Sequence, residues 1–435
     1  MTTANVSYQS ALHALYQLQR FGIKLGLDTT KALLSSVDNP HQHFKTVHIA
    51  GTNGKGSTAA TLASILLATG HQTGLYTSPH LIDFSERIQT DGHPIPHRRL
   101  EALIEQVTAS CPTTITPTFF EFATAIAFLY FSEANIDIGI VEVGMGGRFD
   151  ATNVLKPLVT IITNVGLDHQ KHLGNTIEAV AKEKCGIIQP NTPTVVGNVS
   201  PKALTVIQEV CSTQRSPLVT FGVDFQAVES SPNHFDFHGL RSSYSALRYS
   251  LMGHHQVENA ACALAAVEWL RDTGMPISED GLRQGLVSVQ WPGRLECVAN
   301  NPTVLLDGAH NPTAAEALAK FLADHQRGHS GNIILVIGMQ KDKDMKSFFT
   351  PLIPLANTIV LTRSAHTQSA SAEELAEQLS DKPLHLVYTA SAAEAMMKAH
   401  NTATHEDTIC VTGSLLLVGE VKAHLKGSFF SPLRG

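Results

Sequence analysis

The chain contains 435 residues, of which 43% are hydrophobic and 16% are charged, values typical of a globular protein. Its formal net charge of −7 excludes the strongly basic surface that non-specific binding to nucleic acid or to an anionic membrane requires, so neither partner is expected. No run of 18 apolar residues occurs and the N-terminus lacks the pattern of a secretion signal, so we predict no membrane span. The six cysteines are scattered, which predicts reduced thiols and a cytoplasmic location.

Strand-like and helix-like segments alternate along the first half of the chain, which predicts a parallel sheet with helices on both faces. Helix 175–186 carries its own signals, with Asn175 and Glu178 expected to cap its start and Gly186 to take a left-handed conformation after its end. Residues 217–251 predict a small antiparallel appendage, and residues 255–270 an alanine-rich helix. The other expected strands are 45–50, 73–78, 136–142, 158–164 and 194–197, and the other expected helices are 57–69, 97–110, 118–134 and 201–213.

The pattern breaks near Val287–Arg294, where Pro and Gly interrupt a helix, and we place a domain boundary between residues 290 and 291. Beyond it the alternation restarts, which predicts a small doubly wound domain of about 140 residues. The fold class is therefore α/β, with an N-terminal domain (1–290) and a smaller C-terminal domain (291–435) that meet across a cleft suited to a ligand. The expected strands of the second domain are 303–307, 333–337, 358–361, 385–388 and 408–412.

Residues 47–57 read Val-His-Ile-Ala-Gly-Thr-Asn-Gly-Lys-Gly-Ser, a strand that runs into a glycine-rich loop and then into a helix. This order is typical of a phosphate-binding loop, because glycines let backbone N–H groups turn inward and the helix start adds positive partial charge. Lys55 is expected at the β- and γ-phosphates, and Ser57 is expected to offer its hydroxyl to a magnesium ion. The alternative is a structural turn that happens to hold a lysine.

Polar side chains follow the ends of several predicted strands. Glu142 ends strand 136–142, and ligands of parallel sheets gather at this edge, so its carboxylate is expected to face the glycine-rich loop. His169 follows the next strand, and its pairing with Glu142 favours metal or phosphate contact over a loop cap. Ser78 ends strand 73–78 and by itself reads as a turn residue. Lys184, from spacing alone, reads as a solvated lysine at a helix end.

In the second half, Arg294 and the segment Asp307-Gly308-Ala309-His310-Asn311-Pro312 stand out. Asp307 and His310 occupy a strand-to-helix junction, again at the edge that faces ligands. Asn311-Pro312 is also a good helix start, so the sequence supports nucleotide contact and helix capping equally.

Taken together, these motifs resemble those of the folylpolyglutamate synthases, and most closely the bacterial bifunctional dihydrofolate synthase/folylpolyglutamate synthases, which are relatives of the Mur ligases. The resemblance runs from about Leu25 to Gly419, nearly the full chain. The segments that carry it are residues 51–57, 77–81, 86–88, 119–122, 142–148, 150–153, 167–169, 183–187, 292–294 and 307–312.

The resemblance implies an N-terminal P-loop ATPase domain and a C-terminal Rossmann-like domain, with ATP and two Mg²⁺ ions between them. It implies catalytic roles for Lys55, Glu142, His169, Lys184 and Arg294, with Lys184 converted to a carbamate by CO₂. The implied metal ligands are Ser78, Glu142, His169 and Lys184, together with Ser57 from the loop motif. The implied ATP contacts are Thr52, Asn53, Gly54, Lys55, Gly56, Ser57, Asn259, Arg294, Asp307 and His310. The implied substrate contacts are Lys24, Leu25, Gly26, Arg87, Thr118, Phe119, Phe120, Glu121, Phe149, Asp150 and Ala151.

The expected activity is ATP-dependent addition of L-glutamate to dihydropteroate and to tetrahydrofolate through an acyl phosphate, by a monomer. A Mur-type ligase for a UDP-muramoyl substrate is the nearest alternative, but segments 119–122 and 150–153 weigh against it. The stretch of about 45 residues before the loop is also too short for the extra uridine-nucleotide domain. A protein that binds ATP as a regulatory signal without ligating anything is the alternative from another class.

Overall fold

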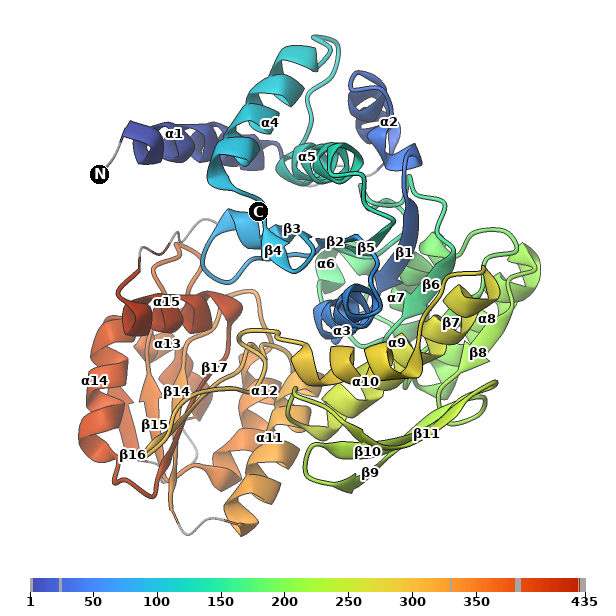
Figure 1. Cartoon of the computed structure of the whole chain (residues 1–435). Coiled ribbons are helices and arrows are strands. Elements are labelled where there is room, and N and C mark those ends of the chain that lie inside the picture. Colours follow the sequence, from blue (N-terminus) through green and yellow to red (C-terminus); the bar gives the residue numbers. More distant parts are fainter. Residues whose placement is uncertain (1–2, 23–25, 329–330, 380–384, 429, 431–435) are drawn as a thin grey trace.

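The computed structural model describes residues 3–22, 26–328, 331–379, 385–428 and 430. Figure 1 shows two α/β units side by side, each a sheet flanked by helices, with a three-stranded sheet attached to the first unit. The α/β class predicted from the sequence is confirmed, and every strand of the second unit follows residue 295. A domain boundary between residues 290 and 291 agrees with this arrangement and remains a prediction.

The first unit is built on an eight-stranded sheet in the order β4-β3-β2-β5-β1-β6-β7-β8. Six neighbouring strands, from β2 to β8 in this order, are parallel, whereas β3 and β4 pair antiparallel at one edge. Because β1 lies between β5 and β6, the loop after it opens between the carboxyl ends of its two neighbours. The strands are β1 (Lys45–Ala50), β2 (Thr73–Tyr76), β3 (Ile88–Thr90), β4 (His93–Pro94), β5 (Ile138–Glu142), β6 (Val159–Ile162), β7 (Thr194–Val196) and β8 (Leu218–Thr220).

Helices cover both faces of this sheet, because successive strand residues point to opposite sides. Ile161 packs in the core under α3, α9 and α10, whereas Ile162 packs under α7 and α8 on the other face. Helices α1, α2, α4 and α5 continue that second face over β2 and β5. The helices are α1 (Thr3–Gln17), α2 (Asp28–Ser35), α3 (Lys55–Ala68), α4 (His97–Ser110), α5 (Phe119–Glu133), α6 (Gln170–Leu173), α7 (Ile177–Lys184), α8 (Pro201–Gln214), α9 (His254–Asp272) and α10 (Glu279–Ser288), with 3₁₀ turns η1 (Leu18–Phe21), η2 (Pro40–Gln42), η3 (Phe84–Arg87) and η4 (Cys185–Ile187).

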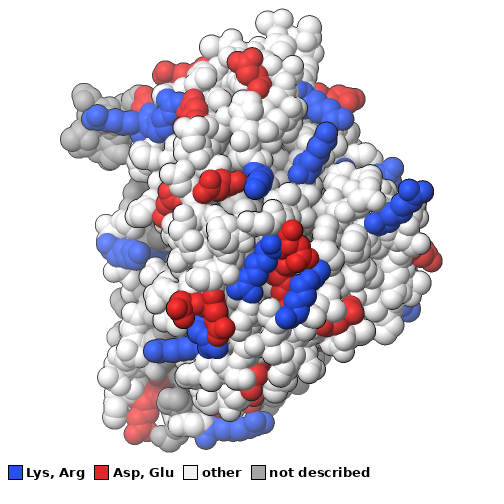
Figure 2. Space-filling view, turned by 45° about the vertical axis from the view of Figure 1, so that its right-hand side comes forward, with Lys and Arg blue, Asp and Glu red and all other residues white. Residues whose placement is uncertain are grey.

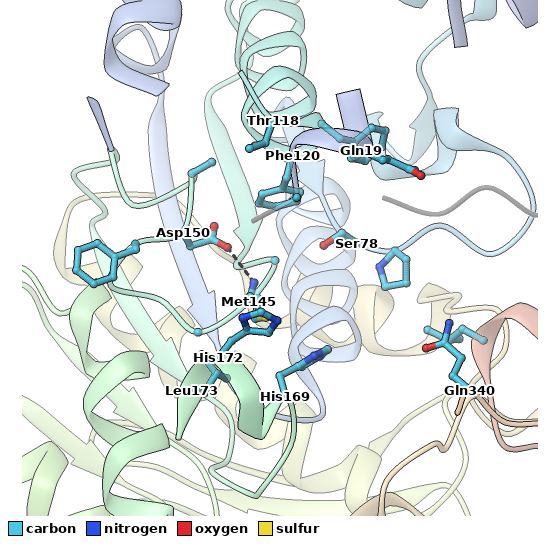
Figure 3. Close-up of a pocket in the computed structure, with 18 of the residues that line it drawn as sticks. Gln19, Ser78, Thr118, Phe120, Met145, Asp150, His169, His172, Leu173 and Gln340 are labelled. Carbon is cyan, nitrogen blue, oxygen red and sulfur yellow. Dashed lines mark hydrogen bonds between the residues drawn. The ribbon is translucent and has the colours of Figure 1, made fainter. Parts of the chain in front are cut away.

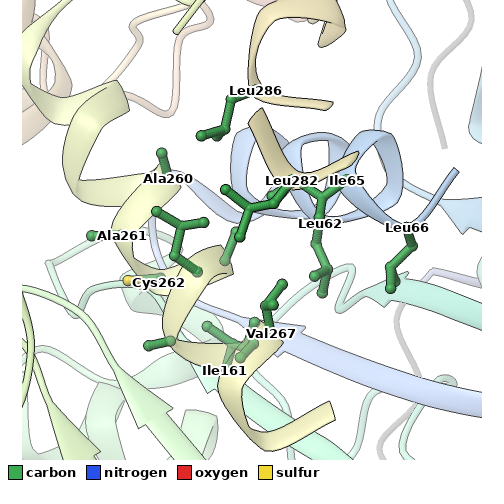
Figure 4. Close-up of a cluster of buried hydrophobic side chains, with 14 of the residues drawn as sticks. Leu62, Ile65, Leu66, Ile161, Ala260, Ala261, Cys262, Val267, Leu282 and Leu286 are labelled. Atoms are coloured by element: carbon green, nitrogen blue, oxygen red, sulfur yellow. The ribbon is translucent and has the colours of Figure 1, made fainter. Parts of the chain in front are cut away.

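Helix α3, which begins at the glycine-rich loop, is held in place by apolar packing on several sides. Figure 4 shows Leu62 and Ile65 of α3 facing Leu282 of α10, beside the small residues of α9. A Cβ atom at Gly285 of α10 would lie 2.4 Å from the Cα of Ile65, so the two helix backbones touch. A helix that is apolar all round is expected only where it is enclosed. The loop that precedes α3 therefore rests on a fixed base.

The region predicted as an antiparallel appendage is partly different from the prediction. Its first strand, β8, joins the large sheet in parallel, and the attached three-stranded sheet contains β9 (Gln226–Ser231), β10 (His234–His238) and β11 (Ser243–Arg248). A strand of three residues is too short for its apolar pattern to distinguish a parallel edge from a hairpin. The elements α1, α2, α6, β3, β4 and β12 were also absent from the prediction.

The expected capping of helix 175–186 is wrong at both ends. The N-cap of α7 is Thr176, whose hydroxyl accepts a hydrogen bond from the backbone N–H of Ala179 at 3.2 Å. Gly186 lies inside the turn η4 and is not among the residues with positive φ. A Cβ atom there would lie 2.3 Å from the Cα of Arg148. Close backbone contact, and not a left-handed cap, therefore explains this glycine.

The second unit is a six-stranded sheet in the order β12-β13-β17-β14-β15-β16, parallel except for β12. All five predicted strands are present, and helices lie on both faces, as expected of a doubly wound domain. The strands are β12 (Glu296–Ala299), β13 (Thr303–Leu306), β14 (Ile333–Ile337), β15 (Thr358–Leu361), β16 (His385–Tyr388) and β17 (Thr408–Thr412); the helices are α11 (Pro312–Arg327), α12 (Met345–Leu352), α13 (Ala372–Ala376), α14 (Ala392–Thr402) and α15 (Leu415–Lys426), with turns η5 (Ile353–Leu355) and η6 (Glu377–Leu379).

The surface and the cysteines show few features of particular partners. On the face shown in Figure 2, basic and acidic side chains are interspersed. Within the described residues, none of the helices combines the length and apolar character needed to cross a membrane. All six cysteines are free thiols.

Candidate active site

The glycine-rich loop follows β1 and ends where α3 begins at Lys55. Gly54 has a φ of 80°, a conformation that favours glycine. A Cβ atom at Gly54 would lie 2.2 Å from the side-chain oxygen of Asn259, and one at Gly56 would lie 2.6 Å from the ring of Trp291. Asn259 on α9 and Trp291 after α10 therefore lie directly against the loop, and both glycines are required for this contact.

The side chain of Lys55 is folded over its own loop. Its Nζ donates to the carbonyl oxygens of Gly51 and Thr52, both at 3.1 Å, and lies 3.9 Å from Oε1 of Glu142. The predicted lysine and the predicted carboxylate are thus brought together. This follows from the sheet order, because β5 lies beside β1.

Glu142 is 5% exposed and is held at its other oxygen by the next strand tip. The backbone N–H of Ser78 donates to Oε2 of Glu142 at 3.1 Å. Burial raises the pKa of Glu142, and the charge of Lys55 opposes this effect. Glu142 is therefore a buried carboxylate held between a backbone donor and a lysine, and no cluster of three His, Cys, Asp or Glu side chains forms a metal site among the described residues.

His169 begins the short helix α6 in a left-handed conformation, with a φ of 50°. Figure 3 shows its ring and Ser78 pointing into one cavity from different segments. Burial lowers the pKa of His169 to about 4, and the nearby Lys343 and His310 also lower it. The imidazole is therefore neutral at physiological pH, which is the form that binds metals.

Lys184 ends α7 and is 3% exposed, so the interpretation as a solvated lysine, based on spacing alone, is wrong. Two glycines explain its burial: Cβ atoms at Gly147 and Gly186 would each overlap the neighbouring backbone, so the chain around Lys184 packs directly on the loop after Glu142. Burial lowers the pKa of Lys184 to about 7, with a further lowering from Lys55.

Asp307 and His310 follow strand β13 of the second unit, at the strand-to-helix junction expected from the sequence. Asp307 accepts hydrogen bonds from the backbone N–H groups of Leu295 at 2.9 Å and Ala309 at 3.0 Å. His310 lies with its Nε2 3.5 Å from Asp168 of the first unit. Asn311 caps α11, because its side-chain oxygen accepts a hydrogen bond from the backbone N–H of Ala314. Neither Asp307 nor His310 is therefore a helix cap.

Polar contacts between the two units surround this site. Asn53 of the glycine-rich loop and Asn311 exchange two side-chain hydrogen bonds, at 3.0 and 3.1 Å. Asp168 pairs with Nζ of Lys343 at 2.8 Å, and the Lys343 side chain is only 9% exposed. Neither the role of Lys343 nor the contact of Trp291 with the glycine-rich loop was predicted from the sequence. A lysine in Lys341-Asp342-Lys343-Asp344 gives no local sign that it contacts another domain.

A cavity of about 580 Å³ opens beside the cluster of Lys55, Glu142 and His169. Figure 3 shows Phe120 and Thr118 on one side and His169 and His172 on another. Lys24 and Leu25 lie outside the described residues. The predicted substrate contacts that line the cavity are Gly26, Thr118, Phe119, Phe120, Glu121, Phe149, Asp150 and Ala151.

Two of the predicted substrate carboxylates also shape the cavity wall. Asp150 accepts from the backbone N–H of Met145 at 2.9 Å (dashed in Figure 3), and Glu121 accepts from Thr118 at 2.7 Å in the capping box of α5. Arg87 is fully buried, donates from Nε to His80 at 2.9 Å, and is absent from the described lining of the cavity. Substrate contact by Arg87 remains a prediction.

Comparison with known protein families identifies the class to which this fold and site belong. Residues 49–267 match the family described as Mur ligase middle domain, and residues 293–415 match Mur ligase, glutamate ligase domain. The chain is therefore a Mur-type, ATP-dependent ligase.

Individual relatives narrow this class. The dihydrofolate synthase/folylpolyglutamate synthase of Bacillus subtilis is 37% identical over 97% of this chain and 99% of the relative. The structure of E. coli FolC in complex with DHPP and ADP has a TM-score of 0.89 at 32% identity, covering 98% of this chain and 99% of that one. The Yersinia pestis bifunctional folylpolyglutamate synthase/dihydrofolate synthase, complexed with AMPPNP and Mn ion, has a TM-score of 0.88 at 31% identity, covering 98% of this chain and 100% of that one. The chain belongs to the dihydrofolate synthase/folylpolyglutamate synthase family, which confirms the resemblance found in its motifs.

Proposed function

We propose that this protein joins L-glutamate to dihydropteroate and adds further glutamates to tetrahydrofolate, with conversion of ATP to ADP and phosphate. The observation that carries the proposal is the cluster of Lys55, Glu142, His169 and Lys184 beside a cavity lined by aromatic rings. The family membership and the names of the relatives support the same activity.

ATP is proposed to bind with its phosphates on the glycine-rich loop, where backbone N–H groups, the start of α3 and Lys55 all favour negative charge. Its other contacts are assigned to Asn259, which lies on α9 against the loop, to Arg294, and to the junction of Asp307 and His310. The amine of Lys55 donates to carbonyl oxygens of its own loop, and it can exchange these hydrogen bonds for phosphate oxygens when ATP binds.

Two Mg²⁺ ions are proposed for the same site, the first near Ser57, Ser78 and Glu142, and the second near His169 and Lys184. The hydroxyls and the buried carboxylate suit a hard cation, and a neutral imidazole is a competent ligand. The donor set therefore fits divalent cations. Bound there, the ions would neutralise charge on the phosphoryl oxygens.

Lys184 is proposed to carry a carbamate. Its pKa of about 7 leaves much of the amine neutral at physiological pH, and the neutral amine is the form that attacks CO₂. A nitrogen–carbon bond forms between the neutral amine and CO₂, one proton leaves the nitrogen, and the neutral amine becomes a carbamate anion. This change suits a site where Lys55 and the metal ions are all positive.

For the reaction itself, an oxygen of the substrate carboxylate attacks the γ-phosphorus of ATP, and ADP leaves. The amine of glutamate then attacks the carbonyl carbon of the acyl phosphate, and phosphate leaves as the nitrogen loses a proton. The fixed charges of Lys55 and Arg294 stabilise the phosphoryl group in transit. Contact between the two units keeps water from the acyl phosphate.

The pterin is proposed to lie in the cavity beside Phe120 and Phe149. Phe120 stacks on Tyr76 with ring centroids 6.0 Å apart, so its orientation is fixed before any ligand arrives. Planar aromatic rings favour a planar heterocycle over the flexible UDP-muramoyl group of the nearest alternative substrate.

The direct experiment is an assay of glutamate-dependent ADP release with dihydropteroate, and separately with tetrahydrofolate. Multiple turnovers with either substrate support the proposal and exclude a protein that only binds ATP. Silence with both substrates, while ATP still binds, would overturn it. A UDP-muramoyl substrate in a parallel reaction tests the Mur-type alternative.

We further propose that the protein acts as a cytoplasmic monomer with no nucleic-acid or membrane partner. Its six free thiols and the mixed charges on the face in Figure 2 support this. Size-exclusion chromatography with light scattering tests the assembly state, and a mass near 46.8 kDa is expected.

A further inference from the structure

The segment that connects the two units has an unusual backbone on both sides of Arg294. Gly293 has a φ of 72°, and Leu295, which is 1% exposed, has a φ of 48°. A left-handed leucine is unfavourable and persists only where its surroundings fix it. Arg294 thus lies between two left-handed residues, in a geometry that something outside the segment must hold.

Two carboxylates fix this segment. Asp307 accepts from the N–H of Leu295 at 2.9 Å, and Glu296 accepts through Oε2 from the N–H of Gly293, also at 2.9 Å. Each acceptor holds the backbone on one side of Arg294. The arginine Nη1 in turn donates to the carbonyl oxygen of Gly293 at 3.0 Å.

Glu296 is itself oriented by a lysine from the last helix. Nζ of Lys422, on α15, lies 2.7 Å from Oε2 of Glu296, and the lysine side chain is only 7% exposed. The Glu296 side chain is 27% exposed, but the nearly buried Lys422 has little water to replace this partner, so the pair has a defined geometry. Lys422 on α15 therefore orients the carboxylate of Glu296, and this carboxylate in turn accepts from the N–H of Gly293.

Arg294 is directed toward the reaction site. Its charge lowers the pKa of Glu142, and a Cβ atom at Gly308 would lie 2.8 Å from its Nη1. The guanidinium interacts electrostatically with Asp307 and Glu142, and its backbone is the one that Glu296 and Lys422 hold.

We propose that Glu296 and Lys422 are positioning residues that hold Arg294 in the active site, although neither is assigned to contact ATP. This inference rests on the proposed function, which assigns ATP contact to Arg294. The pair acts through the backbone of Gly293, so its loss is expected to affect ATP use more than pterin binding.

The test combines Glu296→Leu with Lys422→Met, which removes both charges and leaves no buried charge unpaired. We expect kcat/KM for ATP to fall at least tenfold, with a smaller change in KM for dihydropteroate. The single variant Lys422→Arg keeps the positive charge beside Glu296, so it is expected to retain most of the wild-type activity. Lys341→Met is the matched control, because Lys341 also pairs with a carboxylate, Glu374 at 2.7 Å, on the exposed surface.

A double-mutant cycle separates positioning from general damage. If the pair acts through Arg294, adding the two substitutions to Arg294→Ala produces no further loss in kcat/KM for ATP. Losses that multiply, or an unchanged kcat/KM in the pair variant, would overturn the inference. Full activity in Arg294→Ala would instead overturn the ATP contact assigned to Arg294 in the proposed function, and this inference with it.

A second variant and a spectroscopic signal cover the case in which the paired variant does not fold. Glu296→Asp keeps the charge but withdraws the carboxylate by one methylene. We expect kcat/KM for ATP to fall in this variant as well. Trp291 lies against the glycine-rich loop, and the chain has only one other tryptophan, Trp269. In a Trp269→Phe background, Glu296→Asp should shift the emission of Trp291, and unchanged emission together with unchanged kcat/KM would contradict the inference.

Discussion

At the scale of single residues, Lys184 is a buried amine that lies close to a second lysine, Lys55. Lys55 and Lys184 interact electrostatically, and Lys343 and His310 act on His169 in the same way. Like charges held together are unfavourable unless an anion joins them. Triphosphate and a carbamate at Lys184 would supply that anion, which is why modification of Lys184 is central to the proposed chemistry.

The carbamate is tested by Lys184→Ala with and without added bicarbonate. We expect the alanine variant to lose at least 99% of the ligase activity, because the carbamate proposed as a metal ligand cannot form, and bicarbonate should not restore it. In the wild type, removal of CO₂ should lower the rate and bicarbonate should restore it. Near-normal turnover by Lys184→Ala in the same ADP-release assay would contradict the prediction.

The lowered pKa of Lys184 also predicts a pH effect on stability in CO₂-free buffer. An ordinary lysine has a pKa of 10.5, whereas that of folded Lys184 is about 7. Between these values the unfolded chain binds a proton that the folded chain releases, so the free energy of unfolding should rise with pH in this window. Below about pH 7, Lys184 is protonated in both the folded and the unfolded chain, so its contribution to the free energy of unfolding no longer changes with pH. Thermal unfolding of the wild type and of Lys184→Met measures this dependence on pH. Parallel curves of melting temperature against pH for the two proteins would contradict the prediction.

At the scale of elements, the site depends on backbones that touch. The loop after β5 and the end of α7 meet through Gly147 and Gly186, and a Cβ at either would overlap backbone atoms. The backbone N–H of Arg148 donates to Glu183 at 2.8 Å across the same contact. This contact places the backbone of Lys184 against the loop that follows Glu142, although the two residues lie on different elements.

The contact predicts a specific effect of Gly186→Ala. The added methyl would lie 2.3 Å from the Cα of Arg148, and backbone cannot yield easily, so we expect destabilisation by about 1–3 kcal/mol and a loss of ligase activity. Gly328→Ala is the control, because its Cβ would meet its nearest neighbour at 3.7 Å. Urea unfolding of the three proteins is the measurement. Equal midpoints for Gly186→Ala and the wild type would show that the loop and α7 move apart easily.

The elements also show what the sequence could and could not predict. The strand-loop-lysine-helix order located Lys55, and the positions of Glu142 and His169 at strand ends placed them near it, because parallel strands end at one edge. The burial of Lys184 and the contact between Gly186 and Arg148 depend on packing between distant segments. No local pattern records such contacts, and for this reason the capping role predicted for Gly186 was wrong.

At the scale of the whole molecule, polar contacts join the two units at the site, and apolar side chains such as Leu81 pack between the units elsewhere. Asp168 is the centre of this contact, because it pairs with Lys343 and also accepts from Asn311 at 3.2 Å. Burial alone would raise the pKa of Asp168, but His310 and its other cationic neighbours hold that pKa well below its usual range. The carboxylate is therefore charged when the units are in contact.

Removal of this charge should loosen the contact between the units. Asp168→Asn leaves Lys343 almost buried without its partner, so we expect a more open average structure and at least a tenfold rise in KM for ATP. Asp324→Asn is the matched control, because Asp324 pairs with Arg327 on the exposed surface of α11 and such pairs contribute little. Small-angle scattering without nucleotide should show a larger radius of gyration for Asp168→Asn only. Identical scattering and KM values in the two variants would contradict this role.

The whole proposal requires that the substrate carboxylate and the γ-phosphate of ATP meet in the cleft between the two units. Transfer of oxygen reports this meeting directly. Dihydropteroate labelled with ¹⁸O in its carboxylate is incubated with the protein, ATP and glutamate, and the released phosphate is analysed by mass spectrometry. An acyl phosphate predicts one ¹⁸O atom in each phosphate released. Unlabelled phosphate, formed together with the glutamate adduct, would contradict it.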